Sequence, residues 1–334
     1  MSRSLVPAAH GLLAAGLSIA LGCGGTTEGR ELSLAHFLPA DHVLNEAVFT
    51  PFSERLADLS GDRLTVRQYP SGILNSSLPA QYSILLNGVA DIALVVPAYT
   101  PDLFPKTDLI GYPGVCETAL GCTESIARAW PVLEPEFRAR VLAIWSSTPP
   151  VLLTRETPVR TLEDIRGLKI RVSSRSDIPF IEALGASALM QPATELHQSL
   201  TTGVIDGVAI GPSGIVAFRL HEAAAYITTW LPISGLAFVL LMNQETYEAL
   251  SPEERAWIDE AADDALSVAG AMAFERVDAE ALELAREAGV GIVELADSER
   301  RRFEQAIGSA REAGRARDVG GMTVSEVVRL LRGN

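Results

Sequence analysis

The chain has 334 residues, of which 48% are hydrophobic and 21% are charged, a composition typical of a folded globular protein with room for two lobes of about 120–170 residues each. Its formal net charge of −15 disfavours binding to nucleic acid and to anionic lipid surfaces. Beyond the N-terminal segment no run of about twenty apolar residues occurs, so we do not expect the rest of the chain to span a membrane.

The first 30 residues have the pattern of an export signal followed by a tether. Arg3 supplies the positive start, and the apolar run 12–21 is too short for a spanning helix. Small residues then stand directly before Cys23, as in a lipoprotein whose cysteine receives a lipid. We therefore predict a signal peptide over 1–22, a lipid on Cys23 and a flexible tether over 23–30. Ordinary cleavage, which would free a soluble protein, remains the alternative.

The next part of the chain alternates strand and helix patterns. Apolar alternation or short apolar runs predict strands over 32–37, 64–67 and 91–96, and helical spacing predicts helices over 43–59 and 80–86. Asp41 can cap the first helix and Gly61 can end it. The strand 91–96 is apolar throughout, as in a buried parallel sheet.

The same order then recurs. Strands are predicted over 168–172, 188–190 and 206–210, and helices over 178–184 and 194–202. The two halves share one junction. In each half a glycine, Gly88 or Gly203, stands three residues before the aspartate that begins the last strand. We therefore predict an α/β fold of two similar lobes. Ligands of such sheets bind at the carboxyl ends of the strands, which can face each other across a cleft.

The remainder is mainly helical. An apolar strand is predicted over 236–242 and helices over 251–288 and 297–313. Ser251-Pro252-Glu253-Glu254 is a strong helix start, with a serine cap and a glutamate in the capping-box position. The predicted organisation is lobe 1 over 31–150, lobe 2 over 151–245 and bracing C-terminal helices over 246–334.

The two remaining cysteines, Cys116 and Cys122, lie in a glycine-containing loop. In an oxidising compartment they can form a local disulfide, or they can remain two separate thiols. No histidine lies near them, so a metal site is not expected.

Motifs of the common enzyme classes are lacking. The sequence has no G-x-S-x-G, H-E-x-x-H, P-loop or dinucleotide fingerprint. Beyond the signal segment its histidines match no metal spacing, although the first two could share the rim of one loop; they are His36, His42, His197 and His221. We therefore predict no catalytic residue, no cofactor and no metal, while an acid–base pair among the many carboxylates stays open as an alternative.

Several segments, in the right order, resemble the solute-binding proteins of tripartite ATP-independent periplasmic (TRAP) transporters, of the dicarboxylate-binding-protein type. The likeness runs over about 32–310 and rests on five motifs. These are Asp164–Arg171 (D-x-x-G-x-K-x-R), the helix 195–207 ending in G-x-x-D-G, Asn243 followed by Leu250-Ser251-Pro252-Glu253, Gly88–Asp91 and Ala98–Pro101.

This resemblance implies two α/β lobes joined by crossing strands, a long bracing helix and a cleft that closes over its ligand. It also implies that Arg171 holds the ligand carboxylate, which agrees with the planar fork that a guanidinium presents to a carboxylate. An arginine in an alternating strand would otherwise be read as one half of a surface salt bridge.

Further ligand contacts are expected at positions that follow the strands of the two lobes. They are His36, Tyr99, Ser174, Gly211 and Pro212, and for each the alternative is ordinary turn chemistry.

Two departures from the sialic-acid type of this family bear on the ligand. Val151 stands where that type has a second arginine, and Ile210-Gly211 stands where it has an asparagine. A polyhydroxylated sugar acid needs many polar partners. The sequence therefore favours a less polar acid, such as an aromatic, branched or keto acid.

The predicted function is a periplasmic binding protein, not an enzyme, that captures a small organic acid by hinge closure and delivers it to the permease subunits of a TRAP transporter. The predicted partners are the acid and the permease, without nucleic acid. Two alternatives keep the fold: docking of the liganded protein on a sensor kinase, and an exported enzyme that uses the same cleft.

Overall fold

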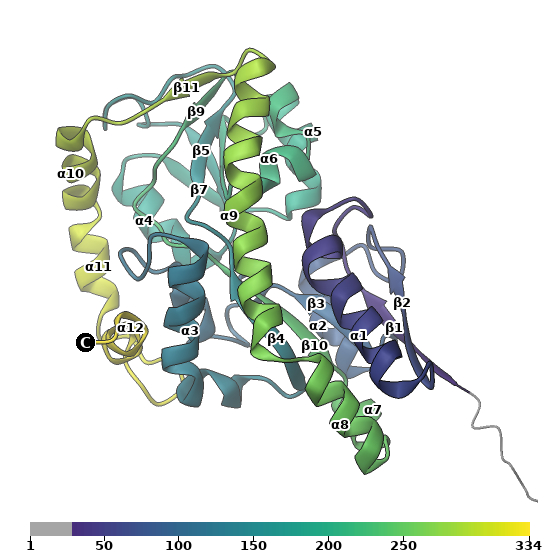
Figure 1. Ribbon diagram of the computed structural model, residues 1–334. Coiled ribbons are helices and arrows are strands. Elements are labelled where there is room, and N and C mark those ends of the chain that lie inside the picture. The colour runs from purple at the N-terminus through teal and green to yellow at the C-terminus, as the bar shows by residue number, and fades with distance from the viewer. Residues whose placement is uncertain (1–28) are drawn as a thin grey trace, which may run out of the picture.

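Two β-sheets organise the chain in the computed structural model, which describes residues 29–334 (Figure 1). The predicted signal peptide and Cys23 lie outside the described residues. Helices cover both sheets, which confirms the predicted α/β class with two lobes. β1 already begins at Arg30, the last residue of the predicted tether. Within 29–334 no helix combines the length and the apolar character needed to cross a membrane.

The first sheet has five strands. In spatial order they are β2 (Leu64–Tyr69), β1 (Arg30–Ala35), β3 (Ile92–Val95), β10 (Ala237–Met242) and β4 (Arg140–Ser146). β1 pairs in parallel with both β2 and β3, whereas β10 runs antiparallel to β3 and β4. All four residues of β3 are buried, as its apolar run predicts.

The second sheet has six strands. In spatial order they are β11 (Gly291–Val293), β9 (Tyr226–Thr228), β5 (Val151–Thr154), β8 (Gly207–Ile210), β6 (Lys169–Val172) and β7 (Ser187–Met190). β6 is parallel to β7 and β8, while β5 runs antiparallel to β8 and β9.

Twelve α-helices accompany these strands in the described part of the chain. They are α1 (Thr50–Ser60), α2 (Gln81–Leu86), α3 (Ala119–Leu133), α4 (Ile178–Ala183), α5 (Leu196–Thr201), α6 (Ser213–Ala217), α7 (Gln244–Glu248), α8 (Pro252–Ala261), α9 (Asp264–Glu287), α10 (Asp297–Ala306), α11 (Gly308–Gly314) and α12 (Val324–Arg332).

The junction repeated in the two halves has a structural role in each sheet. Gly88 and Gly203 follow α2 and α5 with φ of 67° and 73°, a conformation that glycine adopts without steric cost. The aspartate three residues later accepts a backbone N–H from the neighbouring parallel strand. Ser33 N donates to Asp91 and Lys169 N donates to Asp206, both at 2.8 Å. The repeat thus fixes how the last parallel strand enters each sheet.

Two segments cross between the sheets, one between β4 and β5 and the other between β9 and β10. They are hydrogen bonded to each other, because Ser147 N donates to Leu236 O at 2.9 Å. A Cβ on Gly235 would lie 2.1 Å from Ser147 O, so this close approach requires glycine. β10 therefore lies in the first sheet although it falls within the range 151–245 expected for lobe 2, and β11 likewise joins the second sheet from the C-terminal range.

The long helix predicted over 251–288 is two helices, and that prediction was wrong in its continuity. α8 has the predicted capping box at Ser251. It ends at Ala261, and the side chain of Asp263 accepts from Ala265 N to cap α9. The apolar spacing of a helix is present in both α8 and α9, so the sequence pattern predicted one continuous helix. The 24 residues of α9 run alongside both sheets (Figure 1). A Cβ on Gly270 would lie 2.6 Å from the Trp145 ring, so this glycine lets α9 lie directly on β4.

Other boundaries also differ from the prediction. The first helix opens with a π-helical turn, Asn45–Phe49, and the helix predicted over 297–313 is interrupted at Ile307 between α10 and α11. The sequence did not indicate α3, α12, β4, β5, β9 or β11. Cys116 and Cys122 are joined by a disulfide with their Cα atoms 5.0 Å apart, just before and within α3.

Candidate ligand-binding site

The carboxyl ends of parallel strands from both sheets meet at one small cavity of about 50 Å³. Three of the six residues expected to contact a ligand line it: Tyr99 after β3, Arg171 in β6 and Gly211 after β8. In sequence, Tyr99 and Arg171 are 72 positions apart, and Arg171 and Gly211 are 40 apart. The fold brings them together at the carboxyl ends of the strands, where α/β proteins bind ligands.

Arg171 is the buried cation of this cavity, with a relative exposure of 0%. Its Nε donates to Gln191 O at 2.8 Å, and Nη1 donates to Ser173 Oγ at 2.9 Å and to Ala209 O at 3.2 Å. Its Nη2 has no hydrogen-bond partner among residues 29–334. Burial lowers the pKa of the guanidinium, but arginine stays protonated in proteins. The site thus holds a positive charge with one unused donor nitrogen.

Tyr99 lies beside this guanidinium. Burial raises the pKa of its phenol, and the charge of Arg171, together with polar contacts to the Arg171 side chain and the Ala193 backbone, opposes that rise. The phenol is therefore protonated at neutral pH and keeps a hydrogen to donate. Its ring meets that of Phe37 edge to face, with the centroids 6.3 Å apart.

His42 lines the cavity, whereas His36 does not. Burial lowers the pKa of His42 to about 4, so the ring is neutral at neutral pH. Its Nδ1 accepts from Leu44 N at 3.2 Å, which places the single proton on Nε2. His36 is buried against Phe49 with ring centroids 4.9 Å apart, and its pKa is likewise lowered to about 4 by burial.

Most of the remaining wall is apolar and aromatic. Phenylalanines come from four separate elements of the chain: Phe37, Phe218, Phe238 and Phe274. Ile210 and Leu236 add aliphatic surface. Among the described residues that line the cavity, Arg171 is the only arginine or lysine. The cavity therefore combines one cation with a largely aromatic surround.

Ser174 lines a neighbouring cavity, which shares five residues with the first, including Ser173 and Gly211. Its Oγ accepts from Ser176 N at 3.1 Å and caps the turn that follows β6. Pro212 lines a third, larger cavity of about 410 Å³. Sequence reasoning missed Ser173, although it stands two residues beyond Arg171 and so on the same side of the chain. It also missed Ser147, which comes from a crossing segment that gave no signal.

Two acidic side chains line the neighbouring cavity from opposite lobes. Asp108 belongs to the 3-10 turn Thr107–Gly111 and Asp177 to the turn after β6. Burial raises the pKa of Asp108 to about 6, helped by Glu136 and opposed by Ser176, Ser174 and Arg317. Burial, then the charge of Asp108, raise the pKa of Asp177 to about 7, opposed by Ser174 N–H and Arg171. Both carboxyls thus take up protons near neutral pH.

Asp278 of α9 fastens the bracing helix to the site. Its Oδ1 accepts from the N–H of Ser213, the first residue of α6, at 2.7 Å, and its Oδ2 accepts from the hydroxyl of Thr148 in a crossing segment. Burial raises the pKa of this carboxyl to about 6. No group of three or more His, Cys, Asp or Glu within 29–334 is arranged to hold a metal ion.

Residues 34–313 match the family described as DctP, bacterial extracellular solute-binding protein, family 7. The match covers most of the chain. The chain belongs to this family. The predicted membership of the TRAP-transporter binding proteins is therefore confirmed, and with it the prediction of a binding protein rather than an enzyme. Members of the family act outside the cytoplasm.

Relatives and solved structures agree with this assignment. A solute-binding protein of Albidiferax ferrireducens is 23% identical over 315 residues, which cover 88% of each chain. A marine metagenome TRAP solute-binding protein specific for aromatic acid ligands was solved with metahydroxyphenylacetate. It is 26% identical with a TM-score of 0.81, over 91% of this chain and 97% of that chain. The sugar acid binding protein DctPAm of Advenella mimigardefordensis, with galactonate, is 23% identical with a TM-score of 0.83, over 92% and 99%.

The raised pKa values of Asp108 and Asp177 predict a pH-dependent stability. Because the folded protein binds these protons more tightly than the unfolded chain does, their contribution is complete below about pH 4 and is lost as the pH rises to about 7. Each proton taken up changes the free energy of unfolding by roughly 1.4 kcal/mol per pH unit within that window.

Asp177→Asn, which stays neutral, should therefore flatten the fall in melting temperature between pH 5 and pH 8, measured by thermal unfolding. The exposed Asp58→Asn is the matched control and should keep the wild-type profile. A variant Asp177→Asn with an unchanged profile would show that this carboxyl does not take up the proton.

Proposed function

We propose that this family 7 protein captures a small, largely apolar carboxylic acid between its lobes and delivers it to the permease of a TRAP transporter. The observation that carries the proposal is the fully buried guanidinium of Arg171, which lines the cavity and has one nitrogen without a partner among residues 29–334. A buried charge is costly unless it is paired and hydrogen bonded. A ligand carboxylate supplies both the opposite charge and the missing acceptor.

The neighbouring polar groups suit the same anion. The Tyr99 phenol and the Nε2 of neutral His42 each carry a hydrogen to donate. Tyr99 follows β3 and His42 follows β1, two neighbouring strands of the first sheet, whereas Arg171 lies in the second sheet, so a carboxylate on Arg171 would be held from both sheets. The Ser173 hydroxyl already accepts from Arg171 Nη1 and fixes the orientation of the guanidinium.

The apolar wall favours an aromatic acid as the ligand. Four phenylalanines surround the cation, and aromatic side chains pack against an aromatic ligand through offset or edge-to-face contacts. Ile210 lines this cavity and its side chain offers no hydrogen bond to the hydroxyl groups of a sugar acid. The aromatic acid specificity of the marine relative supports this choice.

Capture would proceed by closure about the two crossing segments. They are joined at Ser147 and Leu236, and Asp278 ties one of them to α9 and to the first residue of α6. Movement of a few residues in such segments suffices for hinge closure. The permease would then recognise the closed form, as the family implies.

Replacement of Arg171 tests the proposal. Arg171→Ala should weaken binding of benzoate or 3-hydroxybenzoate by about 2–5 kcal/mol, or roughly 30-fold to several thousand-fold, measured by calorimetry. Arg171→Lys should fall between, because it keeps the charge without the planar fork. Lys169→Ala removes an exposed charge from the same strand and should bind like the wild type.

The ligand panel should also include glucuronate, galactonate and succinate, which we expect to bind more weakly than the aromatic acids. Thermal unfolding without ligand shows whether each variant is folded. Unchanged affinity in a folded Arg171→Ala would contradict the proposed role of this arginine. A preference of the wild type for the sugar acids would contradict the proposed ligand class.

We further propose that Cys23 carries a lipid and that residues 23–30 tether the domain to the membrane. The small residues before Cys23 support this arrangement. In fractionated cells the wild type should be found with the membranes and Cys23→Ser in the soluble fraction. If both are soluble, the segment is cleaved without lipidation and the protein is free in the periplasm.

A further inference from the structure

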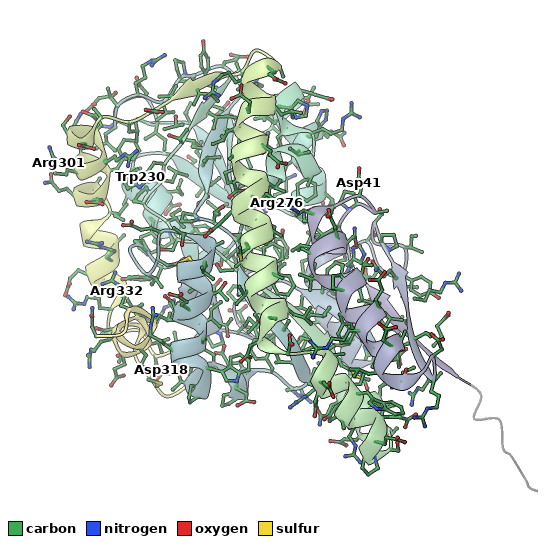
Figure 2. The ribbon with its side chains drawn as sticks, viewed as in Figure 1. Asp41, Trp230, Arg276, Arg301, Asp318 and Arg332 are labelled. Atoms are coloured by element: carbon green, nitrogen blue, oxygen red, sulfur yellow. A yellow bond between two sulfur atoms is a disulfide. The ribbon has the colours of Figure 1, made fainter. Side chains whose placement is uncertain are left out.

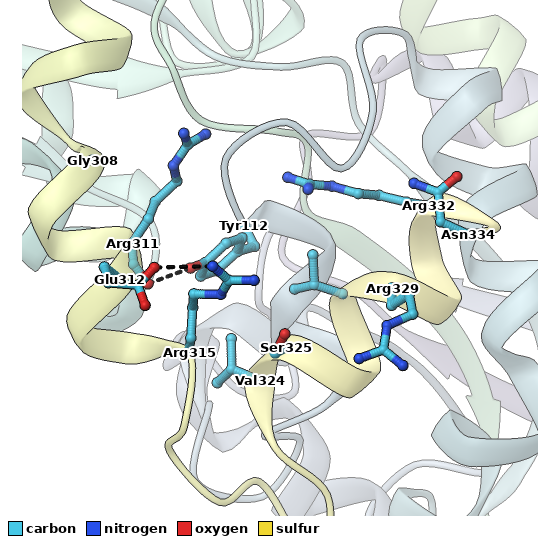
Figure 3. Close-up of a pocket in the computed structure, with 11 residues that line it drawn as sticks. Tyr112, Gly308, Arg311, Glu312, Arg315, Val324, Ser325, Arg329, Arg332 and Asn334 are labelled. Carbon is cyan, nitrogen blue, oxygen red and sulfur yellow. Dashed lines mark hydrogen bonds and ion pairs between the residues drawn. The ribbon is translucent and has the colours of Figure 1, made fainter.

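A second cationic site lies away from the cleft, between α11 and α12. Four arginines line an open pocket of about 350 Å³ there, with Tyr112 at its base (Figure 3). Arg311 lies in α11 and Arg315 directly follows its last residue, whereas Arg329 and Arg332 lie in α12. Figure 2 shows Arg332 at this end of the molecule, on the far side of α9 from Asp41.

The side chains of this pocket have a large excess of positive charge. Glu312 is the only acidic side chain among the described residues that line it, and it pairs with Arg315 at 3.0 Å. Arg311, Arg329 and Arg332 form no ion pair within residues 29–334. Four arginines against one glutamate leave an excess of three positive charges in a chain of net charge −15.

The guanidinium groups of the two helices are close enough to affect each other. Burial lowers the pKa of Arg332, and the charges of Arg311 in α11 and of Arg315 directly after it lower the pKa further. The Tyr112 hydroxyl donates to Arg311 O at 3.0 Å, and Arg332 Nη2 donates to Pro113 O at 2.8 Å. These bonds hold α11 and α12 against the same loop. The fold therefore keeps the arginines at the two helices close together although their charges repel each other.

The two helices also pack on different hydrophobic cores. Ala310 of α11 packs with the core of the second sheet, which includes Phe303 and Ile307. Val327 and Leu331 of α12 belong to the core around α3. Tyr112 packs against both cores. The pocket therefore straddles a boundary between two separately packed parts of the protein.

We propose that this pocket binds a small, multiply charged oxyanion of the phosphate type, at a site separate from the one at Arg171. Guanidinium groups bind phosphate oxygens through pairs of charge-assisted hydrogen bonds. An anion with two or more negative charges offsets the excess charge of the arginines and joins α11 to α12 across the boundary. The phosphate can be free or can belong to a lipid headgroup, since both present the same oxygens.

The test measures binding of pyrophosphate and inorganic phosphate to the full chain by calorimetry at constant ionic strength. The double variant Arg311→Gln/Arg332→Gln should bind at least about tenfold more weakly, because each change removes charge-assisted hydrogen bonds. The charge-matched control is Arg160→Gln/Arg301→Gln, two exposed arginines outside the pocket, which should bind like the wild type. Binding of an aromatic acid reports that every variant is folded.

A parallel arm measures co-sedimentation with vesicles of phosphatidylcholine containing phosphatidylglycerol. If phosphate and pyrophosphate bind and the pocket variant loses this binding, the site takes free anions. If the protein binds only the vesicles, and the pocket variant loses this vesicle binding, the phosphate comes from a lipid headgroup. Binding that the pocket and control variants lose equally, or no binding to the wild type in either arm, would overturn the proposal.

Discussion

The burial of one incompletely bonded guanidinium is the constraint on which the binding site depends. Removing an arginine from water costs several kcal/mol unless opposite charge and acceptors replace the water. Here the protein supplies three acceptors, Gln191 O, Ser173 Oγ and Ala209 O, and leaves Nη2 without one in the described chain. Ser173 directly follows β6, Gln191 directly follows β7, and Ala209 lies in β8. The second sheet thus orients the guanidinium, and the first sheet closes the cavity over it.

The two sheets that position these residues share one structural feature at the entry to a parallel strand. In each half a left-handed glycine ends a helix, and an aspartate then accepts an N–H from the adjacent parallel strand. The two copies are linked by crossing segments that approach too closely for any residue but glycine at 235. Asp278 on α9 bonds both to Thr148 in a crossing segment and to Ser213, the first residue of α6. One carboxylate therefore couples the bracing helix to a crossing segment and to the start of a helix that lines the cavity.

The sequence predicted the fold class and most of the parallel strands, because local periodicity and the repeated junction report on those features directly. Tyr99, Arg171 and Gly211, which line the cavity, were expected as ligand contacts from the resemblance to the TRAP binding proteins rather than from periodicity. The sequence did not predict that His42 lines the cavity. It favoured His36, which directly follows a strand, whereas His42 belongs to the loop beyond. The aromatic wall was also missed, since Phe218, Phe238 and Phe274 come from three elements that only tertiary packing brings together.

The break between α8 and α9 had a local signal, the aspartates at 263 and 264, but the apolar spacing on either side outweighed it. Pairing of Cys116 with Cys122 could not be decided from spacing, because it depends on the geometry of the loop before α3. Three strands that pair antiparallel were also missed. β4 lies at the edge of the first sheet, and β5 and β9 lie inside the second. Their partners lie far along the chain, so these strands depend on pairing rather than on local pattern.

A crystal structure of the protein with the tightest-binding aromatic acid is the most direct test of the central claim. We expect a carboxylate oxygen within hydrogen-bond distance of Arg171 Nη2, with the ring of the acid against Phe238 and Phe274. An acid held in the cleft with its carboxylate away from Arg171, or an Nη2 bonded to another protein group in the complex, would contradict the account.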